Sequence, residues 1–160
     1  MGNPFVEGEH QALKPSATAL VIFGASGDLT QRKLLPALYN LAYDGLLPDS
    51  FIVVGASRTA FSDEEYREKV KESVASFSRR ELDPELWERF SEKVYYHSLD
   101  GNNEADFVRL RERLEGFAVQ HGGVNYNYVY YLATSPNFFS PIAKNLSQAG
   151  LVEPVQDGKR

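Results

Sequence analysis

A short segment, residues 24–29, has the composition of a phosphate-binding turn. It reads Gly-Ala-Ser-Gly-Asp-Leu and lies between an apolar run and a run with helical spacing. A strand that turns sharply into a helix presents the first N–H groups of that helix, which bind phosphate together with the helix dipole. Glycine permits both the sharp turn and the close approach of a pyrophosphate. Gly24 and Gly27 meet these needs, although they equally fit a tight turn without a ligand.

The dinucleotide-binding fingerprint G-x-G-x-x-G is only partly present in this turn. Ser26 stands at its second glycine and Leu29 at its third. A kinase-type phosphate loop is not indicated, because the chain has no Gly-Lys-Ser/Thr triplet. The signal rises above that of a lone glycine pair because a strand precedes the turn and a helix follows it in a βαβ pattern.

The end of the second predicted strand indicates which dinucleotide the turn would bind. NAD sites usually carry an acid there for the ribose hydroxyls, whereas NADP sites use arginine for the extra phosphate. Here the strand ends in Ser57 and Arg58, with no acid. Arg58 could form a forked contact with a phosphate and Ser57 could add a hydroxyl donor. An ordinary surface arginine is the alternative, but this position favours NADP.

Three charged residues follow the glycine turn. We interpret Asp28 as an acid favoured by the helix dipole at a helix start, rather than as a catalytic group. Arg32 and Lys33 lie one turn further along, where they could reach a phosphate or simply be solvated helix charges.

Residues after the third and fourth predicted strands are further candidates, because ligands of open α/β sheets bind at the carboxyl ends of strands. Asp100 could contact the adenosine half of a dinucleotide, or form a turn. Residues 134–139 form a candidate cofactor-facing loop. The pattern contains no catalytic acid–base pair and no activated nucleophile, and the spacing of the three histidines predicts no metal site.

Apolar runs predict four strands, at residues 19–23, 51–56, 94–99 and 128–133. Helices are expected between and after them. The first, residues 29–44, contains Pro36, which should kink it or mark a restart. The second opens with a capping box at residues 62–65, and the third with Asp83-Pro84. A fourth ends at a glycine pair, residues 122–123, and a fifth is capped by Ser140-Pro141.

Each helix has an apolar face that should pack on the sheet. The expected inward residues are Leu34, Leu38 and Leu41 in the first helix, and Tyr66, Val70, Val74 and Phe77 in the second. They are Leu86, Trp87 and Phe90 in the third, Phe107, Leu110, Leu114 and Phe117 in the fourth, and Ile142, Leu146 and Ala149 in the fifth, which should end at Gly150.

Four alternations of strand and helix predict right-handed βαβ units and an α/β fold, with a Rossmann-like, doubly wound parallel sheet between two helical layers. The pattern would next deliver a fifth strand, so we expect the sheet to be incomplete where the chain stops. Residues 1–17 are expected to form a flexible N-terminal arm, and residues 18–160 a partial NADP-binding domain.

The length and composition support one soluble domain or a piece of one. The chain has 160 residues, 42% of them hydrophobic, with a net charge of −5 and no cysteine. An acidic chain is a poor non-specific nucleic-acid binder. No apolar run reaches the roughly 20 residues that cross a bilayer, and residues 1–17 have no apolar core of a secretory signal. We therefore expect a cytoplasmic protein without nucleic-acid or membrane partners.

Three segments together resemble the N-terminal signature of the glucose-6-phosphate 1-dehydrogenase family. They are Val-Ile-Phe-Gly-Ala-Ser-Gly-Asp-Leu-Thr from residue 21, Arg-Lys-Leu-Leu-Pro-Ala-Leu from residue 32, and Asp-Gly-Leu-Leu-Pro from residue 44. Val54 to Arg58, and Tyr131 to Ala133 with Pro136, extend the match. The family oxidises glucose 6-phosphate to its lactone with NADP, the first step of the pentose phosphate pathway.

The resemblance implies a coenzyme site built from several segments. Its members would be Gly24, Ala25, Ser26, Gly27, Asp28 and Leu29 around the coenzyme, with Lys33 nearby, Ser57 and Arg58 at the 2′-phosphate, Asp100 and Gly101 by the adenosine, and Pro136 and Phe139 toward the nicotinamide half.

The resemblance also implies that two segments of the family are missing from residues 1–160. The family's Glu-Lys-Pro-Phe-Gly segment should begin just beyond Arg160, and its Asp-His-Tyr-Leu-Gly-Lys segment, with the histidine general base, is absent. We therefore expect the coenzyme-binding portion of such an enzyme, inactive alone. In the family, the missing C-terminal domain carries the contacts to glucose 6-phosphate and to a second subunit, which implies a homo-oligomer.

Two other functions remain open at this point. One is another NAD(P)-dependent α/β oxidoreductase, although the Tyr-x-x-x-Lys pair of short-chain dehydrogenases is absent. The other is a non-enzymatic dinucleotide sensor.

Overall fold

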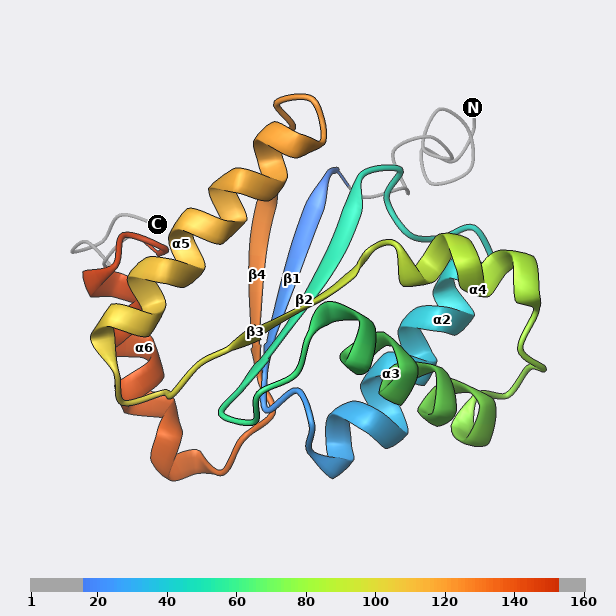
Figure 1. Cartoon of the computed structure of the whole chain (residues 1–160), viewed down its shortest axis with the longest axis horizontal. Helices are drawn as coiled ribbons and strands as arrows, with labels where there is room; N and C mark the ends of the chain where they lie inside the picture. The colour runs from blue at the N-terminus through green and yellow to red at the C-terminus, as the bar shows by residue number, and fades with distance from the viewer. Residues whose placement is uncertain (1–15, 153–160) are drawn as a thin grey trace, which may run out of the picture.

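The computed structural model describes residues 16–152 and contains one parallel sheet of four strands. The strands are β1 (Thr18–Phe23), β2 (Phe51–Ser57), β3 (Val94–Ser98) and β4 (Asn127–Leu132), and their order across the sheet is β3-β2-β1-β4 (Figure 1). Every predicted strand is present, and each bound lies within one residue of the prediction. The parallel α/β fold is confirmed, and the expected fifth strand lies outside the described residues.

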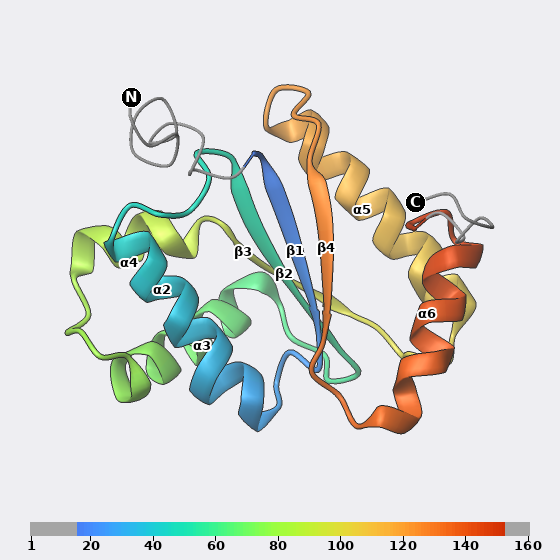
Figure 2. The ribbon, with the colours of Figure 1, turned by 180° about the vertical axis from the view of Figure 1, so that it is seen from behind.

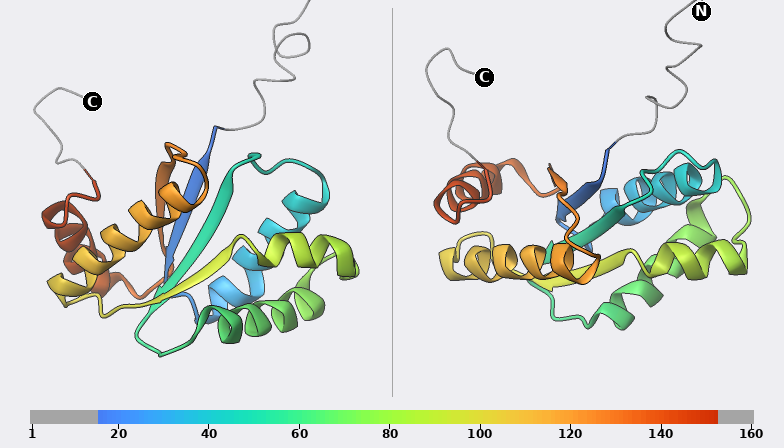
Figure 3. Two further views of the ribbon diagram at one scale, coloured as in Figure 1. Left: turned by 45° about the horizontal axis from the view of Figure 1, so that its top comes forward. Right: turned by 90° about the horizontal axis from the view of Figure 1, so that it is seen from above.

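Helices cover both faces of the sheet, as predicted. On one face lie η1 (Thr30–Leu34), α2 (Leu35–Tyr43), α3 (Asp63–Phe77) and α4 (Pro84–Ser91). On the other lie α5 (Glu104–Gln120) and α6 (Phe139–Gln148), which follows the short helix η2 (Pro136–Phe138). Figures 1 and 3 show these two layers on opposite sides of the strands. Each layer encloses its own apolar core.

The layer of α5 and α6 packs as the apolar spacing predicts. The predicted inward residues of both helices are buried, and the Phe107 ring stacks on Phe23 of β1 with centroids 5.8 Å apart. The start of α6 is a correction. It begins at Phe139, after η2, so Ser140 and Pro141 lie inside its first turn, where a missing proline N–H costs no helical hydrogen bond.

The layer of α2, α3 and α4 corrects one predicted face. Leu35 and Tyr39 point into the core, whereas Leu34 and Leu38 are only partly buried and Leu41 is 40% exposed. The cause is η1, a π-helical stretch in which the Leu35 N–H donates to the Thr30 carbonyl five residues back. This wide turn changes the register of the faces that follow it.

Proline and the helix caps behave as predicted in this layer. Regular α-helix restarts at Leu35, so Pro36 lies at the start of α2. The capping box of α3 is complete, with the Ser62 hydroxyl accepting from the Glu65 N–H at 3.0 Å. Asp83 caps α4 before Pro84. Phe77 is the exception, because it ends α3 with its ring 44% exposed, under the Arg32 guanidinium at 4.8 Å from the ring centroid.

The predicted N-terminal arm and the expected absence of a membrane-spanning segment can be compared only with the residues that the structure describes. All but the last two residues of the predicted arm, residues 1–17, lie outside the described range. Across residues 16–152, none of the helices has the length and apolar character needed to cross a membrane.

Candidate functional site

The glycine turn connects β1 to the first helix at the carboxyl ends of the strands. The N–H groups of Gly24 and Ala25 both donate to the Ala56 carbonyl of β2, at 2.9 and 3.2 Å. Gly24 has a φ of 94°, and a Cβ there would lie 2.5 Å from the carbonyl oxygen of Ala133. The fold itself therefore requires glycine at position 24.

Gly27 is different, because nothing in the described fold requires glycine there. Its φ lies outside the left-handed region, and an added Cβ would meet only the Gly24 carbonyl oxygen, at 3.4 Å. The space beside Gly27 is open. Glycine at such a position is expected where a ligand phosphate must come close to the protein backbone.

Not all backbone N–H groups of the turn have a hydrogen-bond partner in the described part of the chain. Gly24, Ala25 and Gly27 use their N–H groups within the protein, the last on the Gly24 carbonyl at 3.1 Å. The N–H groups of Ser26 and Asp28, in contrast, donate to no atom in the described part of the chain. They lie where the helix begins, so an anion would meet unpaired donors and a favourable dipole.

Buried side chains hold the carbonyl side of the turn. The Thr30 hydroxyl donates to the Gly24 carbonyl at 2.8 Å. Gln31 Nε2 and Tyr66 Oη donate to the Ala25 carbonyl at 2.8 and 2.9 Å, and the Ser73 hydroxyl donates to Gln31 Oε1 at 2.5 Å. Burial raises the pKa of the Tyr66 hydroxyl above its ordinary value. The sequence analysis missed these residues, because the partners lie up to 42 positions apart.

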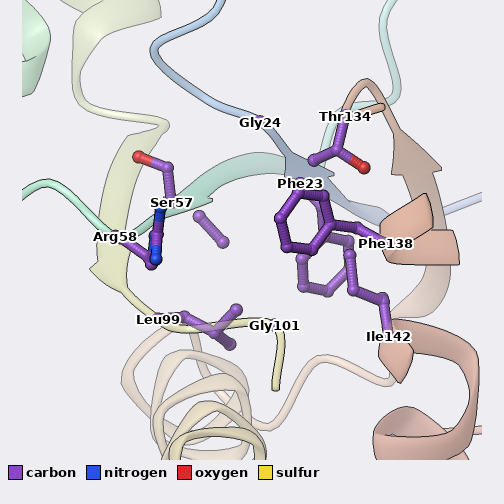
Figure 4. Close-up of a pocket in the computed structure, with 10 residues that line it drawn as sticks. Phe23, Gly24, Ser57, Arg58, Leu99, Gly101, Thr134, Phe138 and Ile142 are labelled. Atoms are coloured by element: carbon purple, nitrogen blue, oxygen red, sulfur yellow. The ribbon is translucent and has the colours of Figure 1, made fainter. Parts of the chain in front are cut away.

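A cavity of about 150 Å³ lies next to the turn, where the strand order reverses between β1 and β4 (Figure 4). Ligands of doubly wound sheets bind at such a point. Apolar side chains from β1 and from the ends of β3 and α6 form much of its wall. The lining residues are Phe23, Gly24, Ala56, Ser57, Arg58, Leu99, Gly101, Thr134, Phe138 and Ile142.

Arg58 stands at the rim of this cavity. Its side chain is exposed and forms no ion pair within residues 16–152. The residues on either side of it are held by one hydroxyl, Tyr96 Oη, which lies 2.5 Å from Ser57 Oγ and donates toward the carbonyls of Ser57 and Thr59, at 3.0 and 2.5 Å. The guanidinium is therefore available to an anion, on a turn that is held in place.

Of the two predicted residues after β3, only one reaches the cavity. Gly101 lines it, and its carbonyl accepts from Asn145 Nδ2 of α6 at 2.9 Å. The carboxylate of Asp100 instead accepts the Asn102 N–H at 2.9 Å, which is the turn-forming role that the sequence left as an alternative. A contact between Asp100 and adenosine stays a prediction.

The other predicted residues lie around the cavity rather than on its wall. Asp28 is exposed and pairs with Arg32 at 3.5 Å, in keeping with its interpretation as a helix-start acid. Lys33 is exposed on η1. Pro136 begins η2 and Phe139 begins α6 with a 41% exposed ring, whereas their neighbours Thr134 and Phe138 face the cavity. Coenzyme contacts by these predicted residues are untested.

Comparison with known proteins identifies the domain. Residues 21–160 match the family described as "Glucose-6-phosphate dehydrogenase, NAD binding domain". A glucose-6-phosphate 1-dehydrogenase of Chlamydia pneumoniae is 43% identical over 138 residues, which is 86% of this chain and 27% of that protein. Its counterpart from Bacillus subtilis is 36% identical over 82% of this chain and 26% of its own length. The chain thus spans about a quarter of these relatives.

Solved structures agree with this assignment. A glucose-6-phosphate dehydrogenase in complex with its substrate glucose 6-phosphate superposes with a TM-score of 0.77 at 28% identity, over 88% of this chain and 29% of that one. The glucose-6-phosphate 1-dehydrogenase of Mycobacterium avium gives a TM-score of 0.74 at 25% identity, over 86% of this chain and 28% of that one. Because the family model matches residues 21–160, most of the chain, this chain belongs to the glucose-6-phosphate dehydrogenase family, as a coenzyme-binding domain.

Proposed function

We propose that this chain is the NADP-binding portion of an enzyme that oxidises D-glucose 6-phosphate to 6-phosphoglucono-1,5-lactone. The observation that carries the proposal is the cavity at the strand switch point, bounded by the glycine turn on one side and on the other by Arg58, which has no ion-pair partner within residues 16–152. Family membership supports the reaction, and Arg58 supports the choice of NADP over NAD.

Each part of the coenzyme has a proposed place. The pyrophosphate lies on the unpaired N–H groups of the turn, beside Gly27. The adenosine occupies the apolar cavity near Gly101, and its 2′-phosphate contacts Arg58. The nicotinamide half extends toward the segment after β4. A bidentate guanidinium–phosphate contact explains why an arginine, rather than an acid, follows β2.

The described residues bind and orient the coenzyme rather than perform acid–base chemistry. Bound NADP would supply a hydride acceptor. The turn would fix its pyrophosphate and the cavity would exclude water from its adenosine, so that the nicotinamide is placed reproducibly. The general base and the contacts to glucose 6-phosphate are proposed to lie in parts of the enzyme outside this chain, as are the contacts of a homo-oligomer. A cytoplasmic location is likewise proposed.

Coenzyme choice provides the test. We expect the intact protein, meaning the full-length enzyme of which this chain is the coenzyme-binding portion, to bind NADP more tightly than NAD. Arg58→Ala in that enzyme should weaken NADP binding about ten- to hundredfold, because a charge-assisted contact contributes roughly 1.5–3 kcal/mol. NAD binding should change little, since NAD has no 2′-phosphate. Calorimetric titration with both coenzymes measures the effect.

Arg79→Ala is the matched control, since Arg79 is an exposed arginine that does not line the cavity. An Arg58→Ala variant that loses no more affinity for NADP than for NAD would disprove the assignment of Arg58. Failure of the intact protein to reduce NADP with glucose 6-phosphate would disprove the reaction.

A further inference from the structure

We propose that two buried tyrosine hydroxyls divide the positioning of the coenzyme between them. Tyr66 positions the glycine turn, and therefore the pyrophosphate, whereas Tyr96 positions the turn that carries Arg58, and therefore the 2′-phosphate. This inference rests on the proposed function, because it assumes that the cavity binds a dinucleotide. Neither tyrosine lines the cavity, so both act through other residues.

Tyr66 lies directly behind the glycine turn. Its side chain is 1% exposed, and its hydroxyl donates to the Ala25 carbonyl at 2.9 Å. Gly55 of β2 makes room for it, because a Cβ there would lie 2.7 Å from both Tyr66 Oη and Ala25 Cβ. The hydroxyl is therefore confined between β2 and the turn. Gln31 is the second donor to the same carbonyl.

Tyr96 holds the other turn. Its hydroxyl bonds to Ser57 and to Thr59, the residues on each side of Arg58. One hydroxyl thus restrains the carbonyl groups of the residues before and after the arginine, whose own side chain has no ion-pair partner in the described part of the chain. The position of the guanidinium depends on this backbone rather than on side-chain contacts.

The backbone of Tyr96 is itself restrained. Its N–H donates to Asp63 Oδ1 at 2.8 Å, and its carbonyl accepts from the Arg113 guanidinium. Asp63 and Arg113 are in turn paired, at 2.8 Å. The rings of Tyr66 and Tyr96 pack with centroids 4.9 Å apart. Although the two rings pack together, their hydroxyls bond to two different turns. Their effects on coenzyme binding can therefore be measured separately.

The separation predicts opposite coenzyme profiles for two conservative variants of the intact protein. Tyr96→Phe should weaken NADP binding about two- to tenfold, the range for one lost hydrogen bond, and leave NAD binding unchanged. Tyr66→Phe should weaken the binding of both coenzymes by a similar factor, since both carry the pyrophosphate. In an Arg58→Ala background, Tyr96→Phe should have no further effect on the Kd for NADP.

Tyr39→Phe is the matched control. Tyr39 is as buried as the pair, and its hydroxyl accepts the Asp83 N–H at 2.9 Å, away from the cavity. We expect it to lower the unfolding temperature without changing either Kd. A merely structural role for Tyr96 would give this same result, and would overturn the proposal. Equal loss of NADP and NAD affinity in Tyr96→Phe would also overturn it.

A second variant tests the same proposal if Tyr96→Phe does not fold. Ser57→Ala removes the side-chain partner of the Tyr96 hydroxyl. The part of its effect on NADP that acts through Arg58 should vanish in the Arg58→Ala background. An effect that persists there in full would leave Ser57 with only its direct contact to the 2′-phosphate and would contradict the proposal. If the unmodified protein does not prefer NADP, the proposed function fails. If it does and the tyrosine variants do not separate, this inference alone fails.

Discussion

At the scale of single residues, the two glycines of the turn have different reasons to be glycine. Gly24 is required by its positive φ and by the nearby Ala133 carbonyl, whereas Gly27 has room for a Cβ. The sequence pattern treats them alike. The difference depends on the Ala133 backbone, which directly follows β4 and cannot be inferred from the residue spacing around Gly24.

Alanine substitutions should separate these two reasons. Gly24→Ala is expected to lower the free energy of unfolding by roughly 2–4 kcal/mol, from left-handed strain and overpacking together. Gly27→Ala should leave that free energy nearly unchanged and weaken both coenzymes about tenfold or more, because the Cβ occupies the approach to the turn. Chemical unfolding and coenzyme titration of both variants measure this. Unchanged coenzyme binding in Gly27→Ala would refute the phosphate site.

Charged residues at strand ends were predictable in position but not in partner. Arg58 follows β2 as the pattern indicates, and it lines the cavity. Asp100 follows β3, yet its carboxylate bonds to a local N–H. Both arrangements fit the same strand-end position. What distinguishes them is the loop geometry, which brings the Asn102 N–H to the Asp100 carboxylate but brings no carboxylate of the described residues to Arg58.

At the scale of elements, the face of α2 shows where periodicity fails. A spacing of 3.6 residues counted from the glycine turn selects Leu34, Leu38 and Leu41, but η1 widens one turn and brings Leu35 and Tyr39 inward instead. Pro36 was the visible sign that the helix restarts. The π-turn contains Thr30 and Gln31, whose side chains bond to the glycine turn, and Gln31 also bonds to Ser73 of α3. A helical wheel contains none of these contacts and could not locate the π-turn.

The contact between β3 and α5 predicts a pH effect on stability. Burial, with the nearby guanidinium groups of Arg113 and Arg109, lowers the pKa of His97 from 6.5 to about 4. Its Nε2 faces the Asp106 carbonyl at 3.4 Å. Between about pH 4 and 6.5 the unfolded chain therefore binds a proton that the folded chain does not.

The contribution of neutral His97 to the free energy of unfolding should be fully present above pH 6.5 and should decline as the pH falls toward 4. We expect a loss of roughly 1–2 kcal/mol, discounted for the partial exposure of the ring. Urea unfolding at several pH values measures it, with His97→Gln as the comparison. An equally steep decline in His97→Gln would assign the effect to other groups.

At the scale of the whole molecule, the alternation of strands and helices was enough to predict a parallel sheet with two helical layers. The order β3-β2-β1-β4 was not predicted, because α5 carries the chain from one edge of the sheet to the other. That crossover creates the switch point beside the cavity. Its existence depends on which face α5 covers, which the apolar spacing of α5 does not specify.

The edge at β4 predicts how the 160-residue chain behaves alone. Within the described residues β4 pairs only with β1 and forms one edge of the sheet (Figure 2). Val129 and Tyr131 of this strand are 43% and 41% exposed. A strand with one unpaired edge and exposed apolar side chains favours association. We expect the isolated chain to self-associate at micromolar concentrations in sedimentation experiments, and Val129→Lys to reduce this.

Val119→Lys is the control for that experiment, since Val119 is exposed near the end of α5, away from the edge. Equal reduction by both variants would mean that general apolar exposure, rather than the β4 edge, drives association.

The other edge of the sheet is different. Arg67 Nε donates to the Val94 carbonyl at 2.7 Å, and Asp63 and Arg113 bond to the N–H and carbonyl of Tyr96. These side chains occupy the outward hydrogen-bonding positions of β3 that a neighbouring strand would use. The same groups that restrain Tyr96 therefore cap the sheet, and any further strand, from this protein or another, can join it only beside β4.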